Sequence, residues 1–203
     1  MASTQPRFVI LDGVDGSGKT LQAERLCRAW TVEGRPAPLH LREPGSTALG
    51  ERLRALLLES DVRAGAAAET LLFAAARRQM LDELVAPALA AGRDVVCERF
   101  HASTFAYQAV AGELDEELVL SLLEAWAGTP EPTRVVVLDL DARTASARRT
   151  QSADRIEARG TAYLERVVEG YRRYAERFGD LVRIVDASAS PETVAARVLE
   201  VAS

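Results

Sequence analysis

Apolar and polar residues form two alternating kinds of stretch along this chain. Five short apolar runs, rich in Val, Ile and Leu, have the length of buried β-strands: 7–12, 37–42, 94–99, 134–141 and 181–186. The stretches between them repeat their apolar residues every three or four positions, which predicts helices over 19–30, 49–58, 69–90, 103–110, 116–126, 142–149, 161–178 and 191–201. This alternation predicts an α/β fold of three layers, in which a mostly parallel five-stranded sheet is covered by helices on both faces.

Length and charge narrow the class of protein. A chain of 203 residues, 48% of them hydrophobic, predicts a single domain over 1–203. No apolar run approaches the roughly 20 residues that span a bilayer, so we expect no membrane segment. The net charge of −5 argues against binding to long nucleic acid, whereas a small anionic ligand needs only a local basic patch. The two cysteines suit a reducing compartment, and we expect a cytoplasmic protein.

One glycine-rich segment, GVDGSGKT, lies directly after the first predicted strand and before the first predicted helix. It matches G-x-x-x-x-G-K-[ST], in which glycines and a helix N-terminus direct N–H groups at phosphate oxygens. Lys19 is the only lysine in the chain, and a slim amine reaches the β- and γ-phosphates where a planar guanidinium would not fit. The segment predicts a P-loop for ATP, with the Thr20 hydroxyl on Mg²⁺, formed by Gly13, Val14, Asp15, Gly16, Ser17, Gly18, Lys19 and Thr20.

Further stretches indicate the class of reaction. They are LREPGST (41–47), LLFAAARRQ (71–79), ERFHASTFAYQ (98–108) and SADRIEARG (152–160). In this order and at these separations, together with the P-loop, they resemble the thymidylate kinase family, the nucleoside monophosphate kinases that phosphorylate dTMP. The resemblance covers nearly the whole chain, from Phe8 to about Ala187. It implies a P-loop kinase fold, ATP and Mg²⁺, dTMP as the small-molecule substrate, and a homodimer.

The predicted helix over 69–90 carries a pair suited to a nucleobase. Phe73 and Arg77 stand at i and i+4, so they share one helix face. A Phe ring can stack on a pyrimidine, and an arginine can donate to a base carbonyl; the resemblance implies thymine and its O4. Phe73 taken alone is equally well interpreted as a core aromatic. Arg77 favours the binding site, because an arginine beside three alanines on an apolar face requires a partner.

Two arginines each follow the end of a predicted strand, where ligands bind in parallel sheets. They are Arg42 and Arg99, and together they can hold a monophosphate through bidentate hydrogen bonds. The resemblance assigns both to the dTMP phosphate, with Pro44 shaping the loop beneath it. The alternative for each arginine is a surface ion pair with Glu43 or Glu98.

The resemblance implies further roles around the base, the sugar and the metal. Three side chains offer hydroxyl and amide groups to the N3 and O2 edge of the base: Ser103, Thr104 and Gln108. Tyr107 resembles the family's tyrosine that packs against C2′ and leaves no room for a ribose hydroxyl. Asp15 resembles the residue that bonds the sugar 3′-OH and approaches Mg²⁺. Glu98 stands where the family usually has Asp, and its longer carboxylate can reach Mg²⁺ through water.

The predicted chemistry requires no catalytic base. The accepting phosphate has a second pKa of about 6 and is mostly ionised at neutral pH. Catalysis then depends on positioning and charge, from Lys19, Mg²⁺ and arginines such as Arg99. Because the P-loop carries no arginine, we predict that a lid over about 148–160 supplies one. Arg149 is the first candidate and Arg155 the second.

Two other functions remain open on the sequence. A deoxynucleoside kinase would need a carboxylate base beside a 5′ hydroxyl, and Glu43 or Glu98 could serve. A P-loop regulatory switch would bind a nucleotide and a protein partner. Its common GTPase form is excluded, because the Asn-Lys-x-Asp motif needs a lysine and the only lysine is Lys19.

Overall fold

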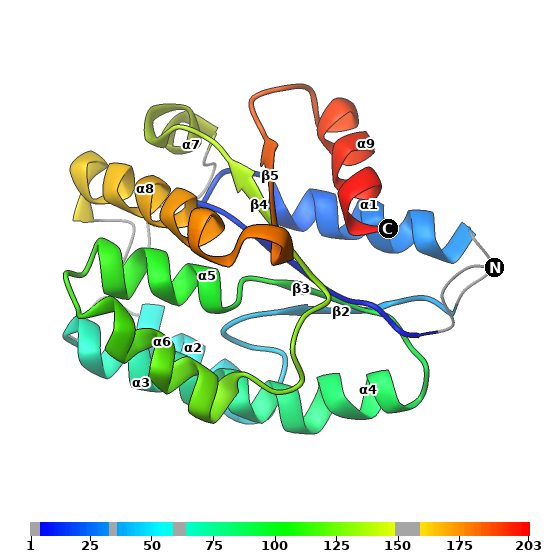
Figure 1. Ribbon diagram of the computed structural model, residues 1–203, viewed down its shortest axis with the longest axis horizontal. Coiled ribbons are helices and arrows are strands. Elements are labelled where there is room, and N and C mark those ends of the chain that lie inside the picture. The colour runs from blue at the N-terminus through cyan, green and yellow to red at the C-terminus, as the bar shows by residue number, and fades with distance from the viewer. Residues whose placement is uncertain (1–4, 33–35, 59–63, 149–158) are drawn as a thin grey trace.

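The computed structural model describes residues 5–32, 36–58, 64–148 and 159–203 (Figure 1). Its strands form one sheet in the order β2-β3-β1-β4-β5, and every neighbouring pair is parallel. The predicted three-layer α/β fold is therefore confirmed. The strands are β1 (Phe8–Asp12), β2 (Leu39–Arg42), β3 (Val95–Glu98), β4 (Arg134–Asp139) and β5 (Val182–Asp186).

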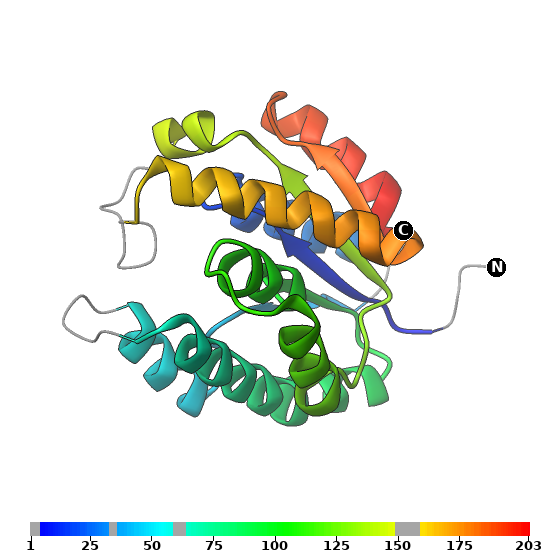
Figure 2. The same ribbon diagram turned by 60° about the vertical axis from the view of Figure 1, so that its left-hand side comes forward.

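Helices cover both faces of the sheet (Figures 1 and 2). On one face, α1 (Lys19–Val32) packs beside α9 (Pro191–Ala202). The other face carries α8 (Thr161–Phe178) and α5 (His101–Thr104), with α3 (Ala66–Met80) and α6 (Glu116–Ala127) packed farther out. Two further helices flank these: α2 (Ala48–Leu58) packs on α3, and α7 (Ala142–Arg148) packs on α8.

Two predicted helices contain a π-helical turn. The helix predicted over 69–90 consists of α3, a π-helical turn over Leu81–Val85, and α4 (Ala86–Ala90). The wider turn precedes Pro87, whose ring would clash with the carbonyl four residues back in a regular helix. The Ala86 N–H accordingly bonds to Leu81 O, five residues back. The helix predicted over 103–110 begins earlier, as α5, and continues as a π-helical turn over Phe105–Val110.

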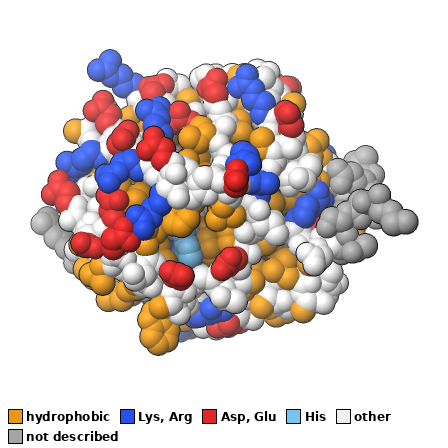
Figure 3. Space-filling view, viewed as in Figure 1, with side chains coloured by type: hydrophobic (Ala, Val, Ile, Leu, Met, Phe, Trp, Pro, Cys, Tyr) orange, Lys and Arg blue, Asp and Glu red, His pale blue; other side chains and the backbone are white. Residues whose placement is uncertain are grey.

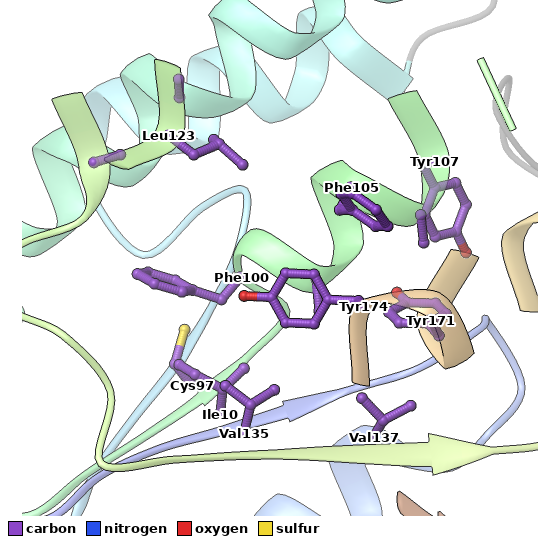
Figure 4. Close-up of a cluster of buried hydrophobic side chains, with 14 of the residues drawn as sticks. Ile10, Cys97, Phe100, Phe105, Tyr107, Leu123, Val135, Val137, Tyr171 and Tyr174 are labelled. Carbon is purple, nitrogen blue, oxygen red and sulfur yellow. The ribbon is translucent and has the colours of Figure 1, made fainter. Parts of the chain in front are cut away.

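The core lies on both sides of the central strand. Along β1, Phe8 and Ile10 enter one apolar cluster while Val9 and Leu11 enter the other, as the two-residue period of a strand requires. Figure 4 shows the first cluster, in which Ile10 lies close to Cys97 of β3. Full burial of each such side chain contributes about 1.5–3 kcal/mol.

The parallel arrangement places the carboxyl ends of all the strands at one edge. The segment after β1 is the P-loop, the segment after β2 holds Glu43 and Pro44, and the segment after β3 begins with Arg99. Ligands of open α/β sheets bind at this edge. Among the described residues, no helix combines the length and apolarity that a bilayer crossing requires.

Candidate active site

The loop between β1 and α1 has a backbone that only glycine adopts readily. Gly13 and Gly16 have φ angles of 136° and 90°. A Cβ on Gly13 would lie 2.6 Å from Leu138 O, and one on Gly16 would lie 2.3 Å from Ala145 O. The Ser17 hydroxyl is buried without a hydrogen-bond partner among the described residues. The loop thus offers an unpaired hydroxyl and backbone N–H groups at a helix N-terminus, which suits a phosphate.

Lys19 lies across this loop. Its Nζ donates to Gly13 O at 2.9 Å and to Val14 O at 3.1 Å, and it lies 3.4 Å from Asp15 Oδ1. Burial, followed by the nearby charge of Arg99, lowers the pKa of this amine from its ordinary value. The amine also lines the open cleft in front of the loop. It can therefore exchange carbonyl partners for phosphate oxygens without leaving the loop.

A group of oxygen atoms lies beside the lysine. The Thr20 hydroxyl donates to Glu98 Oε2 at 2.6 Å, and His40 Nε2 lies 2.9 Å from Glu98 Oε1. Burial would raise the pKa of Glu98, but the hydrogen bonds from His40 and Thr20 outweigh it and lower that pKa. A hydroxyl and an ionised carboxylate on one cleft wall are the ligands that Mg²⁺ accepts directly or through water. These residues therefore fit the predicted metal.

A second pocket adjoins the P-loop cleft and encloses about 580 Å³, its open mouth included. The two hollows share Asp15, Glu43, Arg54 and Arg99 on their walls. The second pocket, hereafter the acceptor pocket, brings together every predicted substrate residue except Arg42: Asp15, Pro44, Phe73, Arg77, Arg99, Ser103, Thr104, Tyr107 and Gln108.

Arg77 is the most buried charged residue in the acceptor pocket, with 1% of its surface exposed. Its Nε donates to Glu43 Oε2 at 2.8 Å, and its Nη2 donates to Thr104 Oγ1 at 3.0 Å and lies 2.6 Å from Glu43 Oε1. Its Nη1 is buried and has no hydrogen-bond partner within the described ranges. A buried unsatisfied guanidinium donor is costly, so it indicates a place for a ligand acceptor atom.

Glu43 is the carboxyl partner of Arg77. It is buried, and burial raises its pKa to about 7 against the opposing charge of Arg77. The folded state therefore holds a proton on Glu43 at pH values where the unfolded chain, with an ordinary value of 4.5, has released it. The contribution of Glu43 to the free energy of unfolding therefore falls as the pH rises between these two values, because the folded state binds more protons at this group.

This titration predicts a pH dependence that one substitution removes. When the pH is raised from about 5 to about 8, the parent loses the stabilisation that comes from the proton on Glu43, and Glu43→Gln has no such proton to lose. The decrease in unfolding free energy over this range is therefore expected to be about 1–3 kcal/mol smaller for Glu43→Gln than for the parent. Urea denaturation of both proteins at each pH measures the difference, in which all other titrating groups cancel. Parallel pH profiles of the two proteins would contradict the raised pKa.

Arg99 has an unusual backbone, with a φ of 67° directly after β3. Its Nη2 forms an ion pair with Asp15 Oδ1, and its Nη1 donates to Ser103 Oγ at 3.0 Å. Burial opposes its charge, but Asp15, first among its neighbours, holds the pKa of Arg99 well above the ordinary value. Tyr107 donates to Asp15 Oδ2 at 3.3 Å. The ion pair holds a guanidinium between the P-loop cleft and the acceptor pocket.

Two predicted base-edge residues are held by buried carboxylates. The Ser103 hydroxyl donates to Asp12 Oδ1 at 2.6 Å, so this group is already engaged behind the pocket wall. Gln108 Nε2 donates to Glu69 Oε2 at 3.2 Å. Phe73 is partly buried on the wall of the acceptor pocket. Its predicted stacking role is compatible with this position.

Arg42 lies apart from the other predicted substrate residues. Its side chain is 56% exposed, lies 3.5 Å from Glu51, and lines the P-loop cleft instead of the acceptor pocket. The predicted lid arginines Arg149 and Arg155 lie outside the described residues. The flanking Arg148 is described, and it lines the P-loop cleft while donating to Ala187 O at 2.8 Å.

Sequence reasoning missed two groups on the pocket walls. Arg54 of α2 donates to Pro44 O at 3.0 Å and lines both hollows. The available signal for Arg54 was its place on the helix that directly follows the LREPGST segment, which brings it close to the pocket. The second is Glu43 as the partner of Arg77, since on the sequence Glu43 was expected only as an ion-pair partner of Arg42 or Arg99, or as a base.

A P-loop cleft that opens into a second polar pocket, at the carboxyl edge of a parallel sheet, defines a P-loop kinase. Comparison with known proteins identifies the family. A sequence profile described as thymidylate kinase matches residues 11–198. The chain belongs to the thymidylate kinase family.

Individual relatives agree over nearly the full length. A thymidylate kinase from Jannaschia sp. (strain CCS1) is 41% identical over 194 residues, which cover 94% of this chain and 92% of that protein. One from Symbiobacterium thermophilum is 41% identical over 189 residues, covering 92% and 88%. The crystal structure of thymidylate kinase from Ehrlichia chaffeensis matches with a TM-score of 0.79 and 26% identity, covering 97% of this chain and 98% of that one.

Proposed function

We propose that this chain transfers the γ-phosphoryl group of ATP to dTMP, forming ADP and dTDP. Nη1 of Arg77 carries the acceptor assignment, because it is buried without a hydrogen-bond partner among the described residues and a ligand in the pocket that Arg77 lines can supply the missing acceptor atom. The O4 atom of thymine meets that requirement, with the ring stacked on Phe73. Arg99, at the junction of the two hollows, then contacts the acceptor phosphate.

The donor nucleotide occupies the P-loop cleft. Residues 13–20 surround its phosphates with backbone N–H groups, and Lys19 contacts the β- and γ-phosphates. Thr20 would hold Mg²⁺ through its hydroxyl, with Glu98 or Asp15 binding through water. The ion neutralises charge on the phosphates when it is bound. Arg42 and Arg148 add positive charge to the same cleft.

Asp15 and Tyr107 select the sugar in this proposal. The Asp15 carboxylate accepts the 3′-OH, and the Tyr107 ring, which is 5% exposed, fills the space that a ribose 2′-OH would need. Thr104 and Gln108 face the base edge. A lid arginine, Arg149 or else Arg155, completes the charge around the transferred phosphoryl group.

An acceptor panel tests the function. With ATP and Mg²⁺, ADP release is measured for dTMP, dUMP, UMP, dCMP and thymidine. We expect dTMP to be the best acceptor and thymidine to be inactive, because Arg99, at the junction of the two hollows, requires a phosphate on the acceptor. Comparable turnover of thymidine would identify a nucleoside kinase instead. Hydrolysis of ATP that no acceptor changes would identify a regulatory switch.

We also propose a homodimer, formed through α3 and α6, and a cytoplasmic location. Three large apolar side chains on these adjacent helices are strongly exposed: Leu71 (58%), Leu118 (69%) and Trp126 (71%). Figure 3 shows hydrophobic side chains at the surface toward its lower edge, where Figure 1 places α3 and α6. Exposed aromatic and aliphatic groups in one region are typical of protein interfaces.

This assignment predicts that a charge at Trp126 separates the protomers. Trp126→Glu is expected to reduce the molar mass in solution from that of two chains to that of one, because the carboxylate would be buried unpaired at the interface. Multi-angle light scattering at equal protein concentration measures the change. The matched control is Ile184→Glu, an exposed apolar residue of the edge strand β5, which should leave the mass unchanged.

A further inference from the structure

One buried carboxylate stands behind the acceptor pocket without lining it. Glu69 of α3 has no exposed surface, and its side chain extends toward two residues far along the chain. Its Oε2 accepts from Gln108 Nε2 at 3.2 Å, and its Oε1 accepts from Arg159 Nη2 at 2.5 Å. Gln108, in turn, lines the acceptor pocket. Glu69 therefore contacts a residue of the pocket wall without itself lining the pocket.

The charge of Glu69 determines which end of the Gln108 amide faces that pocket. An ionised carboxylate can only accept hydrogen bonds, whereas an amide has a donor end and an acceptor end. Arg159 provides the countercharge that a buried carboxylate needs. Because Glu69 accepts from Nε2, the acceptor atom Oε1 is left to face the pocket.

We propose that Glu69 is a specificity-determining positioning residue, which holds the Gln108 amide so that the pocket presents an acceptor to the base. This inference rests on the proposed function. Arg77 lines the same pocket, and its buried Nη1 has no hydrogen-bond partner among the described residues, so it can donate to a ligand there. A donor from Arg77 and an acceptor from Gln108 together would complement a carbonyl next to a ring N–H. Thymine and uracil have this pattern at O4 and N3. At the same positions cytosine has a donor, its 4-amino group, and an acceptor, N3. The amino group would face the Arg77 donor and N3 would face the Gln108 acceptor, so neither hydrogen bond could form.

The test exchanges the carboxylate for an amide of the same shape. In Glu69→Gln the new amide can donate as well as accept, so Gln108 can turn and offer Nε2 to the N3 atom of cytosine. The ratio of kcat/KM for dTMP to that for dCMP is expected to fall at least about tenfold. The ratio for dTMP to dUMP should stay within about threefold, because uracil has the same N3–H and O4.

Two matched variants distinguish the effect of the Glu69 charge on the Gln108 amide from other roles of Glu69. Glu69→Asp keeps a carboxylate, and Arg159→Lys keeps a positive charge beside Glu69 while changing the shape of the group that carries it; both should retain the preference for dTMP over dCMP within about threefold. A uniform loss on all three acceptors in Glu69→Gln would overturn the proposal, as would an unchanged ratio or an equal fall of the ratio in Arg159→Lys. If the parent does not phosphorylate dTMP, the proposed function fails instead.

A measurement on the parent protein tests the same orientation without a variant. Side-chain amide protons of Gln108 that face the buried Glu69 should exchange slowly with solvent, with or without dTMP. Their NMR signals are assigned by their loss in Gln108→Leu. Rapid exchange in the ligand-free protein would place Nε2 in the open pocket and overturn the proposal even if Glu69→Gln fails to fold.

Discussion

Replacement of Lys19 by methionine or by arginine is expected to lower kcat at least about a hundredfold. Nζ lies within hydrogen-bond distance of two P-loop carbonyls, Gly13 O and Val14 O, so the side chain follows a narrow path over the loop. Methionine keeps the length but removes the charge. Arginine keeps the charge, but its planar head is too wide for this path.

Coupled measurement of ADP release gives kcat for each variant, and nucleotide binding monitored by fluorescence separates loss of binding from loss of turnover. The control is Arg25→Met on the same helix, which removes an exposed ion pair with Glu192 and should leave kcat unchanged. If kcat of the Lys19→Arg variant stays within about threefold of the parent value, a positive charge at this position suffices whether an amine or a guanidinium carries it.

Replacement of Arg99 by methionine is expected to weaken the binding of dTMP by about 1.5–3 kcal/mol, the range of a charged hydrogen bond. The guanidinium lies between the acceptor pocket and the P-loop cleft, where its pairing with Asp15 keeps it charged. Methionine retains a side chain at the same φ of 67°, so backbone strain is matched between parent and variant.

Equilibrium binding of dTMP and of thymidine distinguishes the role of Arg99. Thymidine lacks the phosphate, so its binding should weaken far less than that of dTMP. Arg172→Met, which removes an exposed pair with Asp139, is the control and should change neither affinity. Equal weakening of both ligands would assign Arg99 to the shape of the pocket and not to the phosphate.

The local pattern was sufficient for most of the fold. Apolar runs with a two-residue or a 3.6-residue period depend on neighbours a few positions apart, so strands such as β1 and helices such as α8 could be predicted within about two residues. The π-helical turn over Leu81–Val85 was not predicted, although Pro87 was its available signal. The P-loop was equally local, because its binding groups come from one continuous segment.

The acceptor pocket depends on contacts that no local pattern describes. The roles of Phe73, Arg77 and Gln108 were predicted from the family resemblance, and they stay predictions. Their partners were not predicted: Glu43 pairs with Arg77 across 34 positions, and Glu69 bonds Gln108 across 39. Such pairs form only when the sheet brings separate crossovers together.

The sequence by itself determined the parallel α/β fold and the P-loop, because both follow from patterns of residues close together in the chain, whereas the acceptor residues were predicted only from the family resemblance. The tertiary structure alone decided how those side chains are oriented. It placed Arg42 on the P-loop cleft, and it left Arg77 Nη1 unpaired among the described residues. The physical reason is burial: inside the fold a charge or an amide is held by whichever distant group can compensate its lost hydration.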